Sequence, residues 1–252
     1  MKIDLSTQRI LITGASRGLG RAIAEQLSEA GAELLLHCKS NLDAAEELSK
    51  KLPSSSHVVN CDLSKLSEVE GWLPELVHTY GYINGIINNA GIAIHSPLDT
   101  QTHAWVMDWQ RTLNVNLNAA AILCKEFVAC CDPKKGGRII NISSRAAHKG
   151  NLLPYMAYAA SKAGLIAITK SLARHLGKLH IKAFTVAPGF VNTDMADAFR
   201  SHYGEEHISS DIALDRLTEP GDIAPLVTLL CSGLADHATG STFDLNAGSY
   251  LR

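Results

Sequence analysis

The sequence has few of the features that mark membrane, secreted or nucleic-acid-binding proteins. No apolar run approaches the roughly 18 residues that a membrane-spanning helix needs. Residues 1–5 (MKIDL) include an acidic residue, and no long apolar segment follows them, so we expect no signal peptide. The 23 basic and 25 acidic residues are mixed along the chain, without the basic cluster that binds nucleic acid or lipid headgroups. We expect a cytoplasmic protein with neither a membrane nor a nucleic-acid partner.

Cysteine is also scarce, and its spacing favours neither disulfides nor a metal site. The six cysteines show no C-x-x-C pair and no framework of the kind found in small secreted proteins. Free thiols in a reducing compartment are the simplest interpretation. We therefore expect no disulfide and no bound metal.

Nothing in the chain marks a boundary between domains. Linkers rich in Pro, Gly or Ser, low-complexity tracts, charge blocks and short repeats are all missing from the 252 residues. The one long irregular stretch, residues 194–216, is mixed and partly helical, and it is a candidate lid over a substrate cleft. We expect a single domain over residues 1–252, large enough to bury a full core.

What the sequence does contain is a regular alternation of strand-like and helix-like segments. Short apolar runs that end at turn residues predict strands, and segments with helical spacing predict helices between them. Because the strands are continuously apolar, they indicate a parallel sheet covered on both faces, a doubly wound α/β fold of Rossmann type with about seven strands. The predicted strands are residues 9–13, 33–38, 58–61, 85–88, 138–142, 181–187 and 242–245, and the predicted helices are residues 19–30, 43–52, 66–80, 105–131, 155–176 and 220–232.

A glycine-rich segment joins the first predicted strand to the first predicted helix. Residues 13–20 read TGASRGLG, in which the glycines permit a tight turn and let a pyrophosphate approach the positive end of the helix. The spacing G-x-x-x-G-x-G differs from the G-x-G-x-x-G of many dinucleotide-binding proteins, and glycines also serve turns that bind nothing. The position between strand and helix favours a dinucleotide site made of Gly14, Ser16, Arg17, Gly18, Leu19 and Gly20.

The end of the second predicted strand indicates which dinucleotide binds. An acidic residue there would hold the ribose 2'-hydroxyl of NAD and would repel a 2'-phosphate. Residues 36–41 read LHCKSN, so Lys39 stands in the region of that acid, and Arg17 in the glycine turn adds a second cation. The alternative is that both cations are merely solvated. Together they favour NADP(H) as the cofactor.

Tyr158 and Lys162 lie four residues apart in a predicted helix, which puts the phenol and the amine on one face. A free tyrosine has a pKa of about 10, which is poorly suited to proton transfer near neutral pH. A nearby ammonium favours the phenolate, so we expect Lys162 to lower the pKa of Tyr158. Tyr155 lacks such a partner, because Ala159 stands four residues later. A tyrosine–lysine pair of this spacing is common on helix surfaces, so its meaning depends on its surroundings.

Other polar residues are expected at the same place in the fold. Ser143 and Ser144 end one predicted strand, and residues 88–91 (NNAG) end another, which puts them at the carboxyl edge of the sheet where such folds bind ligands. Asn116 lies within a predicted helix, where asparagine is a mediocre helix former. Each residue alone has a structural explanation. Together, after a glycine turn, they indicate one shared site.

These motifs resemble those of the short-chain dehydrogenases/reductases over essentially the whole chain. Within that family the sequence is most similar to the 3-oxoacyl-[acyl-carrier-protein] reductases, which use NADPH and are usually tetrameric. The resemblance implies an NADP(H)-dependent oxidoreductase, and a homotetramer formed through the helices near residues 105–131 and 155–176. It is carried by TGASRGLG at 13–20, NNAG at 88–91, Asn116, Ser144, YAASK at 158–162 and PGFVNTDM at 188–195.

The resemblance also implies a role for each catalytic residue. Tyr158 would protonate the carbonyl oxygen during reduction. Lys162 would hold the nicotinamide ribose and lower the pKa of the tyrosine. Ser144 would orient the carbonyl by a hydrogen bond. Asn116 would anchor a water that connects Lys162 to solvent.

The cofactor residues implied by the resemblance extend beyond the glycine turn. Asp62 and Leu63 would lie near the adenine, and Asn89 would meet the adjoining ribose. Val191 and Thr193 would meet the nicotinamide carboxamide and the phosphates. The full predicted set is Gly14, Ser16, Arg17, Gly18, Leu19, Gly20, Lys39, Asp62, Leu63, Asn89, Ala90, Gly91, Tyr158, Lys162, Pro188, Gly189, Val191 and Thr193.

One departure from the family pattern affects the site. Tyr158 follows Ser144 by 14 residues, one more than the family pattern leads us to expect, so the loop over residues 145–156 must bulge. The choice between Ser143 and Ser144 as the acting serine therefore stays open.

Three interpretations of the function follow. The first is reduction of a 3-oxoacyl thioester carried by an acyl carrier protein, for which Lys134, Lys135 and Arg174 are candidate docking cations. The second is action on another small ketone, a sugar or a polyketide-type intermediate. The third is a cofactor-sensing protein on the same fold without catalysis, since fold alone does not establish activity.

Overall fold

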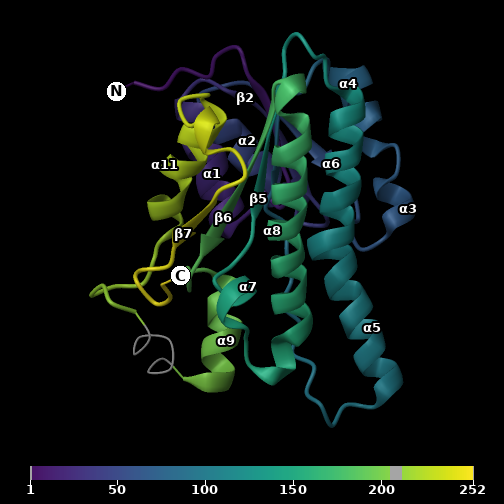
Figure 1. The fold of residues 1–252 in the computed structure, drawn as a ribbon, viewed down its shortest axis with the longest axis vertical. Helices are drawn as coiled ribbons and strands as arrows, with labels where there is room; N and C mark the ends of the chain where they lie inside the picture. The colour runs from purple at the N-terminus through teal and green to yellow at the C-terminus, as the bar shows by residue number, and fades with distance from the viewer. Residues whose placement is uncertain (1, 205–211, 252) are drawn as a thin grey trace.

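The structure, a computed structural model, describes residues 2–204 and 212–251. Its strands form one parallel sheet of seven strands in the order β3-β2-β1-β4-β5-β6-β7, which confirms the predicted fold class (Figure 1). Each predicted strand is present, with ends that differ by at most two residues from the sequence prediction. The strands are β1 Arg9–Ile12, β2 Glu33–Cys38, β3 Ser56–Asn60, β4 Gly85–Asn88, β5 Gly137–Ile142, β6 Ile181–Pro188 and β7 Thr242–Leu245.

Helices cover both faces of this sheet, with α1, α2 and α11 on one side and α4, α6 and α8 on the other (Figure 1). In residues 2–204 and 212–251, no helix combines the length and the apolar character needed to cross a membrane. The helices are α1 Gly18–Glu29, α2 Leu42–Lys51, α3 Leu66–Val69, α4 Trp72–Tyr80, α5 Thr102–Leu113, α6 Ala119–Cys130, α7 Ala146–Lys149, α8 Met156–Leu176, α9 Asp194–Tyr203 and α11 Pro220–Cys231.

The apolar strands supply two cores, one on each face of the sheet. Successive side chains of a strand point to opposite faces. Ile10 and Ile12 of β1 therefore pack with residues of α1 and α11, whereas Leu11 between them packs with residues of α4 and α6. All three side chains are at most 1% exposed. A strand that is buried on both faces has no polar face, which is why these runs are continuously apolar.

Two helices predicted as continuous are interrupted. The segment predicted over residues 66–80 breaks at Gly71, which adopts a left-handed φ of 81° and donates its N–H to Glu126 Oε1 at 2.7 Å. The segment predicted over residues 105–131 begins earlier, at Thr102, and contains a π-helical turn at Asn114–Asn118. The hydrogen bond from Gly71 to Glu126, which lies on α6, stabilises the first break. The π-helical turn interrupts the second segment, and such turns are frequent at functional sites.

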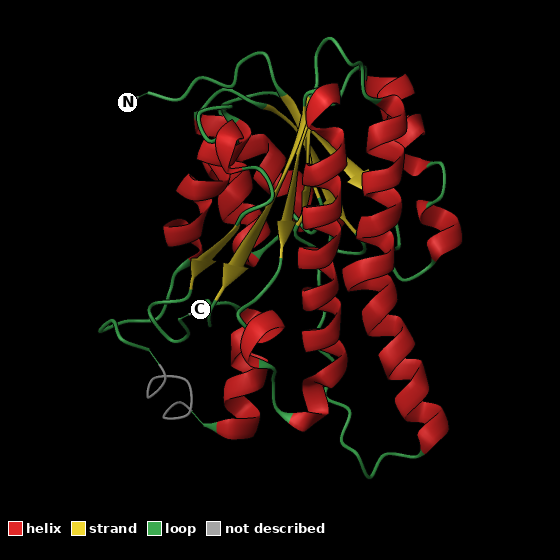
Figure 2. Cartoon of the chain, in the orientation of Figure 1, coloured by secondary structure: helices red, strands yellow, loops and turns green. Residues whose placement is uncertain are grey.

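The strands all end at one edge of the sheet. The arrowheads in Figure 2 point toward the end of the molecule where α7 and α9 lie. The strand order reverses direction between β1 and β4, the position at which doubly wound folds bind nucleotides. The bulge predicted over residues 145–156 takes the form of α7 and a 3₁₀ turn at Leu153–Tyr155. Part of the predicted lid, residues 205–211, lies outside the described residues.

Candidate active site

The glycine turn between β1 and α1 is held by a close approach of two backbone segments. Gly14 has a left-handed φ of 68°, and a Cβ on it would lie 3.0 Å from Cα of Ala90. A Cβ on Gly20 would lie only 2.1 Å from the carbonyl oxygen of Gly14. Backbone atoms thus leave no room for a side chain at these two positions of the turn.

Thr13 and Asn89 connect this turn to the end of β4. The Thr13 hydroxyl accepts hydrogen bonds from the backbone N–H groups of Asn89 and Ala90, both at 3.0 Å. In return, Nδ2 of Asn89 donates to the carbonyl oxygens of Thr13 and Gly14 at 2.9 and 3.1 Å. The side chain predicted to meet the ribose therefore also fixes the turn. The sequence analysis missed Thr13, although a hydroxyl at the end of an apolar strand was a visible signal.

The N-terminus of α1 fits a pyrophosphate. No described side chain caps it, and its first turn carries no acidic residue. The free N–H groups and the positive end of the helix dipole therefore face the region where an anion would bind. Thr193 approaches this turn from the segment after β6, since a Cβ on Gly18 would lie 3.3 Å from its Cγ2. These residues fit the diphosphate of a dinucleotide.

Both cations predicted to bind a 2'-phosphate form a salt bridge with a carboxylate in this structure. Arg17 Nη1 lies 2.8 Å from Oδ2 of Asp194, at the start of α9, and both side chains are more than 70% exposed. Lys39 Nζ lies 2.9 Å from Oδ2 of Asp62, which follows β3. Pairs as exposed as the first contribute at most about 1 kcal/mol. A phosphate dianion could therefore replace Asp194 at Arg17.

We expect Asp194→Asn to tighten NADPH binding about two- to fivefold, because Arg17 would no longer be shared with a carboxylate. NADH, which has no 2'-phosphate, should bind as before. Fluorescence titration of the reduced cofactors measures both dissociation constants. Asp197→Asn removes a charge from the same helix and serves as the control. An equal change for NADH and NADPH would contradict this account of Arg17.

The predicted catalytic side chains meet at the carboxyl edge of β5. Ser144 follows β5 and forms a side-chain hydrogen bond with Tyr158 in the first turn of α8. Burial raises the pKa of Tyr158 above its ordinary value, and the hydrogen bond to Ser144 opposes that shift. The prediction of a lowered pKa for Tyr158 is therefore wrong for this structure, because desolvation of the phenolate outweighs the opposing effects. The hydroxyl keeps its proton at neutral pH.

Lys162 is buried beside the tyrosine. Its side chain is 3% exposed, and Nζ donates to the carbonyl oxygen of Ile142 at 2.8 Å. Nζ lies 5.6 Å from the centre of the Tyr158 ring. Burial lowers the pKa of this amine to about 8. A Cβ on Gly91 would lie 3.3 Å from Nζ, so the glycine keeps the space beside the amine open.

Asn116 sits in the π-helical turn and ties α8 to the segment after β4. Its Nδ2 donates to the carbonyl oxygen of Ile92 at 2.9 Å and to Oγ of Ser161 at 3.0 Å. Its Oδ1 accepts from the N–H of Ile92 at 2.8 Å. Ser161 in turn donates to the carbonyl oxygen of Tyr158 at 2.7 Å. This buried amide thus fixes the turn of α8 that carries the tyrosine and the lysine.

The two serines after β5 face different partners. Oγ of Ser143 donates to the carbonyl oxygen of Lys162 at 2.7 Å, so this hydroxyl is used within the core. Oγ of Ser144 accepts from the N–H of Ala146 at 3.1 Å and pairs with the Tyr158 side chain. The geometry therefore favours Ser144 as the serine that meets a substrate.

We expect Ser144→Ala to lower kcat about a hundredfold, because it removes the hydroxyl beside the reacting carbonyl. Ser143→Ala should leave kcat within about threefold and cost about 1 kcal/mol of unfolding free energy, the usual value of one hydrogen bond. Steady-state kinetics and urea unfolding of the pair measure both effects. The reverse order of kcat losses would assign the role to Ser143.

Known proteins are similar to this chain over nearly its whole length. A family model described as Enoyl-(Acyl carrier protein) reductase matches residues 14–249. The 3-oxoacyl-[acyl-carrier-protein] reductase of Aquifex aeolicus (strain VF5) is 34% identical over 253 residues, which cover 99% of this chain and 100% of that protein. This chain belongs to the short-chain dehydrogenase/reductase family. It is accordingly an NAD(P)(H)-dependent oxidoreductase of carbonyl and hydroxyl groups.

Two solved structures have the same fold and were obtained with NADP. The angucycline C-6 ketoreductase LanV with bound NADP has a TM-score of 0.86 and 30% identity, with 98% of this chain and 96% of that chain covered. A putative NAD(P)-dependent gluconate 5-dehydrogenase from Beutenbergia cavernae, with NADP at low occupancy, has a TM-score of 0.90 and 28% identity, with 99% of each chain covered.

The remaining predicted cofactor residues of this short-chain dehydrogenase/reductase also reach the carboxyl edge. Pro188 ends β6, and Gly189 donates its N–H to the carbonyl oxygen of Leu245 at 3.0 Å. Val191 pairs with Thr218 in an isolated bridge that carries the chain past the site. Leu63, 5% exposed, follows Asp62 after β3.

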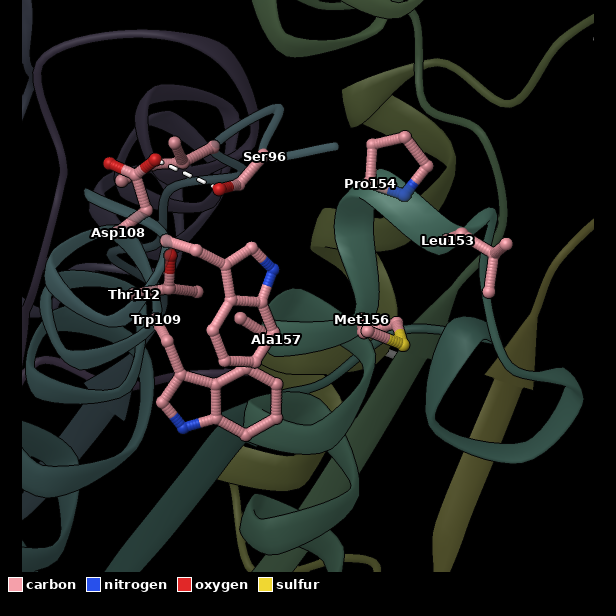
Figure 3. Close-up of a pocket in the computed structure, with 10 residues that line it drawn as sticks. Ser96, Asp108, Trp109, Thr112, Leu153, Pro154, Met156 and Ala157 are labelled. Atoms are coloured by element: carbon pink, nitrogen blue, oxygen red, sulfur yellow. Dashed lines mark hydrogen bonds between the residues drawn. The ribbon is translucent and has the colours of Figure 1, made fainter. Parts of the chain in front are cut away.

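A surface pocket adjoins the site between α5 and the start of α8 (Figure 3). Oγ of Ser96 donates to Oδ2 of Asp108 at 2.9 Å on one side of it, and the indole of Trp109 stacks on that of Trp105 with ring centres 5.1 Å apart. Its described lining includes Ala157 but none of the predicted catalytic residues. This pocket therefore adjoins the catalytic segment of α8 without being lined by its catalytic side chains.

The three candidate docking cations lie at the wrong end of the sheet. Lys134 and Lys135 precede β5, and Arg174 lies near the end of α8 beside residues 239–241, which precede β7. Residues that precede parallel strands lie at the amino edge, opposite the site. The prediction that these cations attract an acyl carrier protein to the entrance is therefore wrong.

Proposed function

We propose that the protein reduces the 3-keto group of an acyl thioester with NADPH. The observation that carries the proposal is the side-chain hydrogen bond between Ser144 and Tyr158, with the buried amine of Lys162 close to the tyrosine ring. This arrangement puts two hydroxyl groups where they can both reach one carbonyl oxygen. The names of the curated relatives support this substrate class.

Each catalytic side chain has a defined task in this reaction. Bound NADPH supplies the hydride that reduces the carbonyl carbon. Tyr158 donates its proton to the carbonyl oxygen, since its hydroxyl is protonated at neutral pH. Ser144 donates a hydrogen bond to the same oxygen and stabilises the charge that develops there. Lys162, whose pKa is about 8, is mostly protonated near neutral pH and favours the tyrosinate left behind.

The glycine turn and its cations support NADPH rather than NADH. Arg17 and Lys39 are the cations at the turn and after β2, and a phosphate can replace the exposed carboxylate of Asp194 at Arg17. The bound NADP in two structural relatives supports the same choice.

The surroundings of Tyr158 support a substrate with an apolar chain. Its ring belongs to an apolar cluster with Tyr155, Phe190, Phe199 and Leu152. Phe199 lies on α9, so the first part of the predicted lid already contributes to this wall. We include in the proposal that the described part of the predicted lid, residues 194–204 and 212–216, covers the acyl chain. We also include that acyl carrier protein delivers this chain to a homotetramer.

A second candidate substrate class is a polyketide-type ketone or a sugar acid, on the strength of the relatives named for such substrates. A cofactor sensor without catalysis is the candidate from another class. It would not require the Asn116, Ser144, Tyr158 and Lys162 set that the fold brings to one edge.

The deciding experiment is a steady-state screen that follows NADPH oxidation by absorbance. Short 3-oxoacyl thioesters, simple ketones and a sugar-acid ketone are compared with NADPH and with NADH. We expect the thioesters to have the highest kcat/KM, and NADPH to be preferred. A clear preference for a sugar-acid or polyketide-type ketone would replace the substrate class. Cofactor binding without turnover of any ketone would favour the sensor.

A further inference from the structure

One histidine interrupts the apolar run of β2. His37 follows Leu34, Leu35 and Leu36 and is only 3% exposed. Its ring lies edge-on to the indole of Trp72 in α4, with ring centres 5.2 Å apart. A buried imidazole in an otherwise apolar strand needs partners for both ring nitrogens. Neither the fold nor the proposed proton transfer accounts for it.

Both ring nitrogens of His37 contact backbone groups of the cofactor region. Nδ1 lies 3.1 Å from the N–H of Gly14, which opens the glycine turn. Nε2 lies 2.9 Å from the carbonyl oxygen of Cys61, which directly precedes Asp62 and Leu63. The carbonyl oxygen of His37 itself accepts the N–H of Ala15 at 2.9 Å. His37 therefore connects the glycine turn to residues 61–63, which include the predicted adenine contacts Asp62 and Leu63 and are called the adenine wall below.

These contacts determine the protonation state of the ring. The N–H of Gly14 is a donor, so Nδ1 must accept, and Nε2 must carry the hydrogen that Cys61 accepts. Burial lowers the pKa of His37, with the Cys61 contact and the charge of Asp62 opposing. Of the groups that face the ring, Gly14 and Trp72 do not ionise near neutral pH, and burial raises the pKa of the Cys61 thiol to about 12. The ring is therefore neutral at neutral pH.

We propose that His37 is a positioning residue for NADP(H), which sets the spacing between the glycine turn and the adenine wall through its neutral Nε2–H tautomer. The proposal rests on cofactor binding at this edge, as in the proposed function, but not on the identity of the ketone. Without the ring, the N–H of Gly14 and the carbonyl oxygen of Cys61 lose their partner, and the turn is free to shift. Because His37 contacts only backbone groups that NADPH and NADH would meet alike, its loss affects both cofactors equally, unlike the loss of Arg17 or Lys39.

The test compares two variants of similar size. His37→Leu removes both contacts, and His37→Asn retains an acceptor close to the position of Nδ1. We expect His37→Leu to raise the dissociation constants of NADPH and NADH about tenfold, by the cost of an unsatisfied buried group, with kcat at saturating cofactor within about twofold. His37→Asn should stay within about threefold of the parent. Fluorescence titration gives the binding constants, and thermal unfolding without cofactor reports the fold.

Each outcome bears on the proposal. Unchanged cofactor affinity in His37→Leu, or equal losses in the Leu and Asn variants, would overturn it. If His37→Leu does not fold, the pH dependence of NADH affinity in the parent and in His37→Asn decides. The parent should lose affinity only in acid, at pH values below the ordinary histidine pKa of about 6.5 because burial lowers the pKa of His37, and the Asn variant should not. Protonation there would set a ring N–H against that of Gly14. Identical profiles would also overturn the proposal. Binding effects without turnover of any ketone would reject the proposed function and leave this inference standing.

Discussion

Replacing Tyr158 with Phe is expected to lower kcat at least about a thousandfold, while the dissociation constant of NADPH changes less than about twofold. The hydroxyl is the group that passes a proton to the carbonyl oxygen, and it pairs with Ser144. The ring itself stays in the apolar cluster with Phe190 and Phe199, so the wall of the site is kept. Loss of chemistry without loss of binding distinguishes a proton donor from a structural side chain.

Tyr155→Phe is the matched control for this loss. Tyr155 belongs to the same cluster and is 5% exposed, but Ala159 stands where a lysine partner would be. Its kcat should stay within about threefold of the parent, since no proton transfer depends on it. Single-turnover and steady-state kinetics with a 3-oxoacyl thioester measure both variants. Substantial remaining turnover in Tyr158→Phe would remove the proposed mechanism.

Gly20→Ala is expected to raise the dissociation constant of NADPH about a hundredfold or more. The added Cβ would lie 2.1 Å from the carbonyl oxygen of Gly14 and 2.6 Å from Nδ2 of Asn89. The carbonyl group of Gly14 cannot yield without a shift of the backbone that would receive the phosphates. Overpacking costs about 1–3 kcal/mol, and the upper end of that range corresponds to about a hundredfold in a dissociation constant. The effect should be the same for NADH, because both cofactors carry the diphosphate.

Gly221→Ala provides the control for Gly20→Ala. Gly221 also lies in the first turn of a helix, α11, and a Cβ on it would meet no described atom within 4 Å. This variant should bind NADPH as the parent does and should be slightly more stable, by about 0.4–1 kcal/mol. Cofactor titration and chemical unfolding measure the pair. Normal NADPH affinity in a folded Gly20→Ala would mean that the phosphates bind elsewhere.

The site residues that could be predicted from the sequence share one property: a pattern formed with residues nearby in the sequence identifies them. The turn at residues 13–20 shows itself through glycine spacing, and Tyr158 with Lys162 through the helical repeat. The docking cations were predicted at the wrong edge of the sheet, although the sequence could have shown this. Lys134 and Lys135 precede a predicted strand and so lie at the amino edge. The partners of Thr13 and of His37 could not be found in this way, because they lie on strands distant in the sequence.

The sequence by itself determined the doubly wound α/β fold and the edge at which its site lies. Strands that are apolar on both faces require helices on both sides, and residues that follow parallel strands must gather at one edge. Only the tertiary structure decided how the site is charged and held. The pKa of Tyr158, the pairing of Arg17 with Asp194 and the break at Gly71 depend on what distant segments bring close. Burial and pairing act through space, whereas the sequence pattern reports only what is near along the chain.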